Sequence, residues 1–106
     1  MKAPWIYLPA AAIVLGAGPA RGDEALAKKS GCMECHAIDK KVIGPAFRDI
    51  AVRYKDDSHA RAALTEKVKN GGKGNWTELT KSVPMPPHRR LSDADIERLV
   101  DWVLGL

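Results

Sequence analysis

The stretch Cys32-Met33-Glu34-Cys35-His36 decides how the rest of this chain can fold. Two thiols three positions apart, followed at once by an imidazole, are the signature of covalent haem attachment. Each thiol can add to one of the two vinyl groups of a haem, and the short turn between them places the His36 ring under the iron. The motif therefore predicts thioether bonds at Cys32 and Cys35 and an axial iron ligand at His36.

A redox-active dithiol and half of a zinc site are the alternatives for the two cysteines. A thioredoxin-like pair lies beside a βαβ pattern, and a structural zinc ion needs two further ligands at ordered spacing. The sequence offers neither context, because it has no other cysteine and its only other imidazoles are His59 and His88. Haem attachment is the favoured interpretation.

The first 22 residues have the pattern of a secretory signal peptide. Lys2 is followed by an apolar run over 3–20 and then by Arg21-Gly22-Asp23, with small residues before the expected cut. The alternative is an uncleaved membrane anchor, but three prolines and two glycines in the run argue against a regular spanning helix. We expect residues 1–22 to be removed and residues 23–106 to form one small domain, for which a bound haem would serve as a staple.

The charge balance argues against a nucleic-acid-binding protein. The full chain carries a net charge of +4, and removal of Lys2 and Arg21 leaves 15 basic against 13 acidic residues. The remaining excess is small and interleaved with acidic residues, whereas nucleic-acid binding requires a clustered basic surface. We expect no nucleic-acid partner.

The domain is predicted to be all-α, with about four short helices wrapped around one haem. Asp23 is the expected N-cap of a helix over 23–30, and a second helix is expected over 46–54. Asp57 or Ser58 is expected to cap a third helix that ends near residue 70, before two glycines. The last helix, capped by Ser92 and extending to about residue 104, has an apolar stripe that should pack across the first helix.

A second iron ligand is expected in Val83-Pro84-Met85-Pro86-Pro87. The prolines restrict the backbone and present Met85 on a stiff loop, and a thioether suits haem iron. Met33 is excluded because it lies inside the attachment turn, whereas His88 is a competitor that would give a bis-histidine haem. A methionine that merely packs in a proline-rich turn is the other interpretation.

Two further segments contain candidate supporting residues. The turn at Gly44-Pro45 is either an ordinary turn before a helix or the place where a carbonyl accepts the other imidazole proton of His36. Trp76 either packs or donates its indole N–H to a haem propionate, with Lys67 or Lys73 supplying positive charge.

Together these residues resemble the small bacterial class I cytochromes c, of the cytochrome c-551 and c-552 type. The resemblance spans nearly all of 23–106. The matching stretches are Gly31-Cys32, Cys35-His36-Ala37-Ile38-Asp39, Gly44-Pro45-Ala46-Phe47, Lys69-Asn70-Gly71, Trp76, Pro84-Met85-Pro86-Pro87 and Trp102-Val103-Leu104.

The resemblance implies a cytochrome c fold, one covalently bound haem c, and His36 and Met85 as the axial ligands. It also implies a Pro45 carbonyl bonded to His36, Trp76 near a propionate, and Lys67 where relatives often have an arginine that reaches a propionate.

Such proteins are not enzymes but one-electron carriers of the bacterial periplasm. Their partners are terminal oxidases, nitrite reductases, peroxidases or quinol-oxidising complexes, and we expect a monomer without stable membrane insertion once the leader is cleaved. The alternative is a haem enzyme or gas sensor with a labile sixth ligand.

The chain departs from the family pattern at two places. The stretch from Thr77 to Val83 is longer than the usual loop by about four residues, which puts the geometry of Trp76 in doubt. His88 stands where many relatives have an asparagine near the methionine sulfur, so the reduction potential could be retuned or become sensitive to pH.

Overall fold

The structure is a computed structural model that describes residues 19–106. Within this range it contains five α-helices, one 3₁₀ helix and no strand, which confirms the predicted all-α fold. The predicted signal peptide lies largely outside the described residues. The elements are α1 (Pro19–Lys29), the 3₁₀ helix η1 (Cys32–Glu34), α2 (Phe47–Arg53), α3 (Ala60–Asn70), α4 (Thr77–Thr80) and α5 (Asp93–Leu104).

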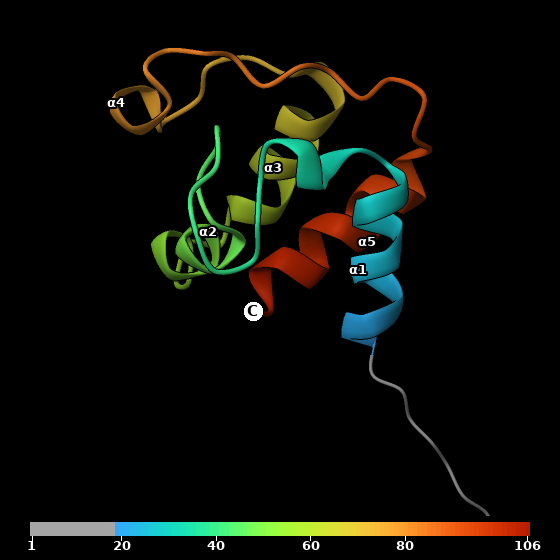
Figure 1. Ribbon diagram of the computed structural model, residues 1–106. Helices are drawn as coiled ribbons and strands as arrows, with labels where there is room; N and C mark the ends of the chain where they lie inside the picture. Colours follow the sequence, from blue (N-terminus) through green and yellow to red (C-terminus); the bar gives the residue numbers. More distant parts are fainter. Residues whose placement is uncertain (1–18) are drawn as a thin grey trace, which may run out of the picture.

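Helix α5 is the element against which the other long helices pack (Figure 1). It begins as predicted, because the Ser92 hydroxyl accepts the Asp95 amide at 3.1 Å and so satisfies one of the free N–H groups of the first turn. Its apolar stripe contacts α1, α2 and α3, which confirms the expected packing of the last helix on the first. The residues that α5 buries are Ile96, Leu99, Val100, Trp102 and Val103.

The main core cluster joins α1, α2 and α5. Phe47 of α2 meets Trp102 of α5 edge to face, with ring centroids 5.5 Å apart, and Ala27 of α1 is completely buried beside them. Burying aromatic rings of this size contributes about 2 kcal/mol or more each. This cluster positions the start of α2 and thereby the loop that precedes it.

Two predicted helix starts are wrong. In the described chain α1 begins at Pro19, so Asp23 lies inside the helix instead of capping it, and its buried carboxylate pairs with Arg98 of α5 at 2.7 Å. Helix α3 has His59 as its N-cap residue, and the Asp57 carboxylate accepts the His59 amide at 2.8 Å. Asp57 therefore shapes the turn before the helix.

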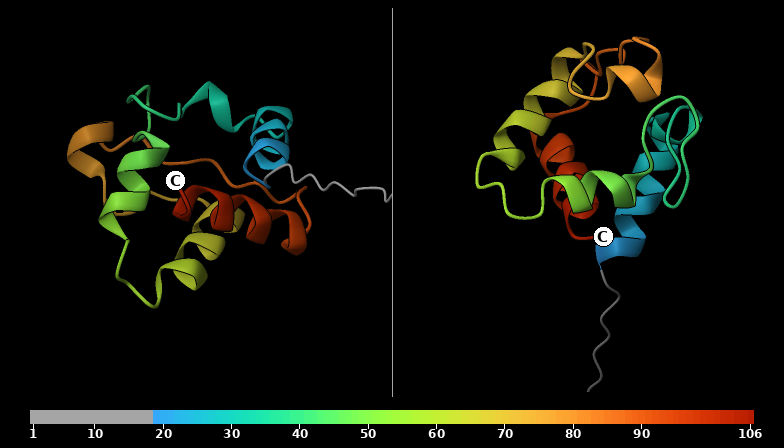
Figure 2. Two further views of the ribbon diagram at one scale, coloured as in Figure 1. Left: turned by 90° about the horizontal axis from the view of Figure 1, so that it is seen from below. Right: turned by 90° about the vertical axis from the view of Figure 1, so that its left-hand side faces the viewer.

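The lengthened stretch before Val83 is not an open loop. Its first part folds into α4, which is followed by Lys81 and Ser82, two non-glycine residues with φ of 56° and 64°. These two residues with positive φ end the helix and reverse the chain direction before Val83. In the right-hand view of Figure 2, α2, α3, α4 and the loop between His36 and Pro45 are seen around a central region, with α5 at the lower left, partly behind α2. None of the helices in 19–106 has the length and apolar character needed to cross a bilayer.

Candidate functional site

The attachment pentapeptide follows α1 directly. Gly31 adopts φ of 85° and reverses the chain, after which Cys32 to Glu34 form η1 and the His36 amide bonds to the Cys32 carbonyl at 3.0 Å. Both cysteine side chains are half-buried and form no disulfide with each other. Glu34 is exposed. The turn thus presents two unpaired thiols and one imidazole from five consecutive residues.

The His36 ring is held on three sides. Its Nδ1 lies 2.7 Å from the Pro45 carbonyl oxygen, and Phe47 stacks on it at a centroid distance of 4.9 Å. Gly44 is buried so close that a Cβ there would lie 2.7 Å from the ring. Burial, and to a smaller degree the charge of His88, lowers the pKa of His36. A neutral ring that donates its Nδ1–H to Pro45 leaves the Nε2 lone pair available to a metal.

Met85 is held by its backbone. Its N–H and C=O bond to Gly72 in both directions at 2.9 Å, forming an isolated antiparallel bridge. Gly71, with φ of 73°, lies under this bridge, and a Cβ on it would lie 2.5 Å from the Met85 carbonyl oxygen. The side chain of Met85 is half-buried. The turn that follows α3 therefore fixes the position of the Met85 backbone.

His88, the competing ligand, belongs to the same segment as Met85. Its amide bonds to the Val68 carbonyl of α3 at 3.0 Å, and its side chain is half-buried. The segment from Met85 to His88 is consequently bonded at one end to Gly72, just after α3, and at the other end to Val68 of α3.

Trp76 and Lys67 have different surroundings. The Trp76 ring is half-buried, and the guanidinium of Arg53 lies over it at 4.9 Å from the centroid. The Lys67 ammonium lies beside the backbone of Gly72, 3.1 Å from where a Cβ on that glycine would be. Sequence reasoning missed Arg53, because a charged residue at the end of a helix gives no signal that it contacts an aromatic ring more than 20 positions away.

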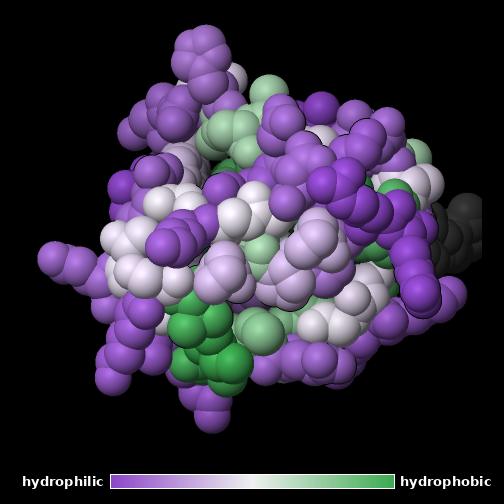
Figure 3. Space-filling view, turned by 90° about the horizontal axis from the view of Figure 1, so that it is seen from above, coloured by the Kyte–Doolittle hydropathy of each residue, from purple (hydrophilic) through white to green (hydrophobic). Residues whose placement is uncertain are grey.

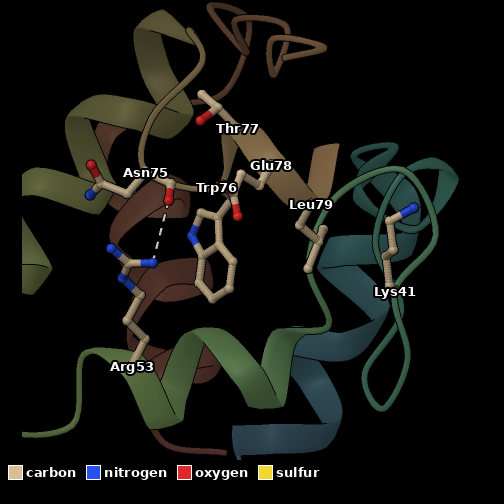
Figure 4. A pocket seen from close by; sticks show the side chains of 7 residues that line it. All are labelled: Lys41, Arg53, Asn75, Trp76, Thr77, Glu78 and Leu79. Carbon is tan, nitrogen blue, oxygen red and sulfur yellow. Dashed lines mark hydrogen bonds between the residues drawn. The ribbon is translucent and has the colours of Figure 1, made fainter. Parts of the chain in front are cut away.

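A cavity of about 700 Å³ lies between α2 and α4 (Figure 4). Trp76 extends into this space, and Lys41 stands on the loop that follows His36. Neither cysteine, nor His36, nor Met85 lines the cavity, whose walls come from the end of α2, from residues 75–79 at the start of α4, and from Lys41 on the loop after His36. The lining residues are Lys41, Arg53, Asn75, Trp76, Thr77, Glu78 and Leu79.

The donor set fits a haem and does not fit a structural zinc ion. No group of three or more His, Cys, Asp or Glu side chains able to hold a metal occurs in 19–106. The available donors are instead two thiols, an imidazole oriented through its Nδ1, and a thioether on a separate loop. Thioether bonds to the porphyrin and two axial bonds to iron would use these donors.

Comparison with known proteins supports this assignment. The family model described as "Cytochrome c" matches residues 20–106. Cytochrome c-552 of Nitrosomonas europaea is 44% identical over 106 residues, which is 100% of this chain and 99% of that sequence. Cytochrome c-551 of Allochromatium vinosum is 46% identical over 87 residues, 82% of this chain and 88% of its own length.

A solved structure agrees with these sequence matches. The crystal structure of wild-type Nitrosomonas europaea cytochrome c552 superposes with a TM-score of 0.71 at 44% identity, covering 78% of this chain and 98% of that one. The chain therefore belongs to the cytochrome c family of electron carriers, and its cofactor is one haem c bound covalently through the Cys-x-x-Cys-His motif.

Proposed function

We propose that the chain is a periplasmic one-electron carrier whose haem iron is ligated by His36 and Met85. The observation that carries this proposal is that hydrogen bonds hold the His36 ring and the Met85 backbone in place. The His36 ring is oriented by the Pro45 carbonyl at 2.7 Å, and the Met85 backbone is bonded twice to Gly72 at 2.9 Å. Tertiary hydrogen bonds thus restrain both of the proposed iron ligands.

Restrained ligands suit electron transfer. When bound, the haem supplies an iron that exchanges one electron between its ferric and ferrous states. The protein's part is to keep the same two ligands at similar positions in both states, so that little geometry changes with each electron. A thioether opposite an imidazole also raises the reduction potential above that of a bis-histidine haem.

A matched pair of methionine variants tests the ligation. Met85→Leu keeps the volume of the side chain but removes its sulfur, whereas Met33→Leu makes the same change inside the attachment turn. We expect the oxidised wild type and Met33→Leu to show the long-wavelength methionine-to-iron charge-transfer band, and Met85→Leu to lose it while the haem stays attached. An unchanged band in Met85→Leu would contradict the assignment.

The same spectra separate the carrier from a haem enzyme or gas sensor. Those functions need a vacant or labile sixth position, which gives a high-spin ferric haem. We expect a low-spin spectrum in the wild type. Loss of the band in His88→Ala, and not in Met85→Leu, would instead assign the second axial position to His88.

The periplasmic location rests on residues 1–22. The sequence match to Nitrosomonas europaea cytochrome c-552 covers all of this chain, whereas the match to its crystal structure leaves about a fifth uncovered, close to the length of the expected leader. Export and cleavage before Asp23 predict a periplasmic product whose mass equals residues 23–106 plus one haem. Recovery of the haem protein with residues 1–22 still attached would contradict cleavage.

The partners are expected to be redox proteins of respiration, such as a terminal oxidase, nitrite reductase, peroxidase or quinol-oxidising complex. Among the described residues, the large apolar side chains with substantial exposure are Val42, Ile43, Val52 and Val83. Figure 3 shows a small group of strongly hydrophobic atoms within a mostly polar face. An apolar contact with a polar rim is typical of short-lived complexes. Reduction kinetics with each purified partner at several ionic strengths would identify the physiological one.

A further inference from the structure

The wall of the cavity between α2 and α4 carries positive charge at Arg53. This arginine is the last residue of α2 and lines the cavity together with Trp76, whereas Lys67 does not line it. In Figure 4 the Trp76 ring stands in the middle of the space, with its indole nitrogen on the side where Arg53 lies. A cationic group and an N–H donor therefore face the same region.

Three contacts hold the Arg53 guanidinium in place. It lies over the Trp76 ring at 4.9 Å and near the Tyr54 ring at 5.8 Å. Its Nη1 donates to the Asn75 carbonyl oxygen at 3.3 Å, and the Asn75 side chain in turn donates to the Tyr54 hydroxyl at 3.1 Å. These contacts orient the planar group but use few of its five N–H donors.

Arg53 has no carboxylate partner among residues 19–106. Its neighbour on the same helix, Arg48, pairs with Asp39, and Arg61 and Arg98 also have acidic partners. Glu78 on α4 is the acidic residue of the cavity wall, and it forms no ion pair with Arg53. An oriented guanidinium with free donors is suited to bind a carboxylate through two hydrogen bonds.

We propose that Arg53, oriented by Trp76 and Asn75, is the residue that pairs with a haem propionate in this chain. Haem brings two carboxylates into a protein that must neutralise them, and the cavity wall offers Arg53, Lys41 and the indole N–H of Trp76 for this purpose. The family resemblance implies that Lys67 reaches a propionate, but the Lys67 ammonium lies beside Gly72 instead of on the cavity wall, so Arg53 takes this role. This inference requires the haem but not ligation by Met85.

The pairing has a measurable consequence for the reduction potential. A propionate that ionises near the iron makes the midpoint potential fall as pH rises through its pKa, since its negative charge favours the ferric state. A neighbouring cation lowers a carboxyl pKa by one unit or more, so loss of Arg53 should move this pH window upward by roughly one unit. At higher pH, loss of the positive charge should also lower the midpoint potential.

The test measures midpoint potential against pH for the purified haem protein and its Arg53→Gln, Lys67→Gln and Arg48→Gln variants. Arg48→Gln is the matched control because it removes the same charge from the same helix, where the guanidinium pairs with Asp39. We expect an upward shift of the window in Arg53→Gln only. A shift in Lys67→Gln as large as in Arg53→Gln would overturn the proposal, and so would an unshifted window in Arg53→Gln.

A second measurement uses the wild type and so does not depend on the folding of a variant. Nuclear Overhauser contacts in the reduced protein should connect the propionate methylene protons with the Arg53 guanidinium or Trp76 indole protons. Contacts to Lys67 with none to Arg53 would refute the proposal. The charge-transfer band of Met85 serves as an independent readout, so failure of this inference is distinguishable from failure of the proposed ligation.

Discussion

Replacing Gly44 by alanine tests whether the His36 ring is as tightly enclosed as the structure indicates. A Cβ at this position would lie 2.7 Å from His36 Cε1 and 3.1 Å from both ring nitrogens. Restoring an ordinary contact of 3.4 Å requires the ring or the backbone to move by about 0.7 Å. The ring is already confined by Phe47 and by its bond to Pro45, so little free space is available for this movement.

The expected cost is about 2 kcal/mol of unfolding free energy, the middle of the range for inserting a methyl group into a packed site. Gly44 does not have a positive φ, so alanine is not strained by its backbone. For a domain of this size the cost corresponds to a Tm roughly 8 to 16 °C lower. We also expect the His36 Nδ1 proton to exchange faster with solvent, because the displaced ring holds its bond to Pro45 less well.

Gly105→Ala is the matched control for this experiment. Gly105 also has ordinary backbone angles, and the nearest atom to its new Cβ is the Asp101 carbonyl oxygen at 3.4 Å. Both variants gain the same stabilisation from a stiffer unfolded chain, about 0.4 to 1 kcal/mol, so their difference isolates the steric term. Thermal unfolding of both proteins with haem bound measures it. A Gly44→Ala protein as stable as Gly105→Ala, with unchanged His36 proton exchange, would show that the His36 ring is not tightly enclosed.

Further predictions concern α4 and the contact between α1 and α5. Among the side chains of residues 23–106, the Thr80 hydroxyl is the one buried polar group that lacks a hydrogen-bond partner. Thr80→Val should therefore be neutral or stabilise by up to about 1 kcal/mol in denaturant unfolding, and a loss of more than that would show that the hydroxyl has a partner in the haem protein. Lys81→Gly should stabilise the protein by about 0.5 kcal/mol. The left-handed backbone costs a non-glycine residue about 1 to 2 kcal/mol, but glycine loses more conformational entropy on folding, which cancels part of the gain. Destabilisation would contradict the positive φ. Removing Arg98 should cost about 1 kcal/mol, because the Asp23 carboxylate then stays buried without its partner, although the half-exposed arginine limits the effect. A double-mutant cycle with Asp23→Asn measures this coupling, and additive effects would mean that the ion pair contributes nothing.

Local sequence signals were sufficient for much of the fold. Ser92 with Asp95 predicts the start of α5, and the apolar stripe that follows predicts its buried face, because capping and helical periodicity act within one or two turns. The same kind of signal predicts Gly71 as the end of α3. Local signals failed at the start of α1 and in the stretch from Thr77 to Val83, where a short helix depends on packing more than on its own propensity.

The cofactor could be predicted from the amino-acid sequence alone, since the five residues from Cys32 to His36 contain the whole chemistry of attachment. The sequence also predicted Met85 as the second axial ligand, because prolines on both sides keep that segment from forming a helix. The packing of the helices was needed to show that Gly44 lies against the His36 ring and Gly71 against the Met85 backbone, and that Arg53 instead of Lys67 lies on the cavity wall. The physical reason is distance along the chain: chemical identity and turn geometry are local, whereas the place where a side chain ends up depends on how separate helices pack.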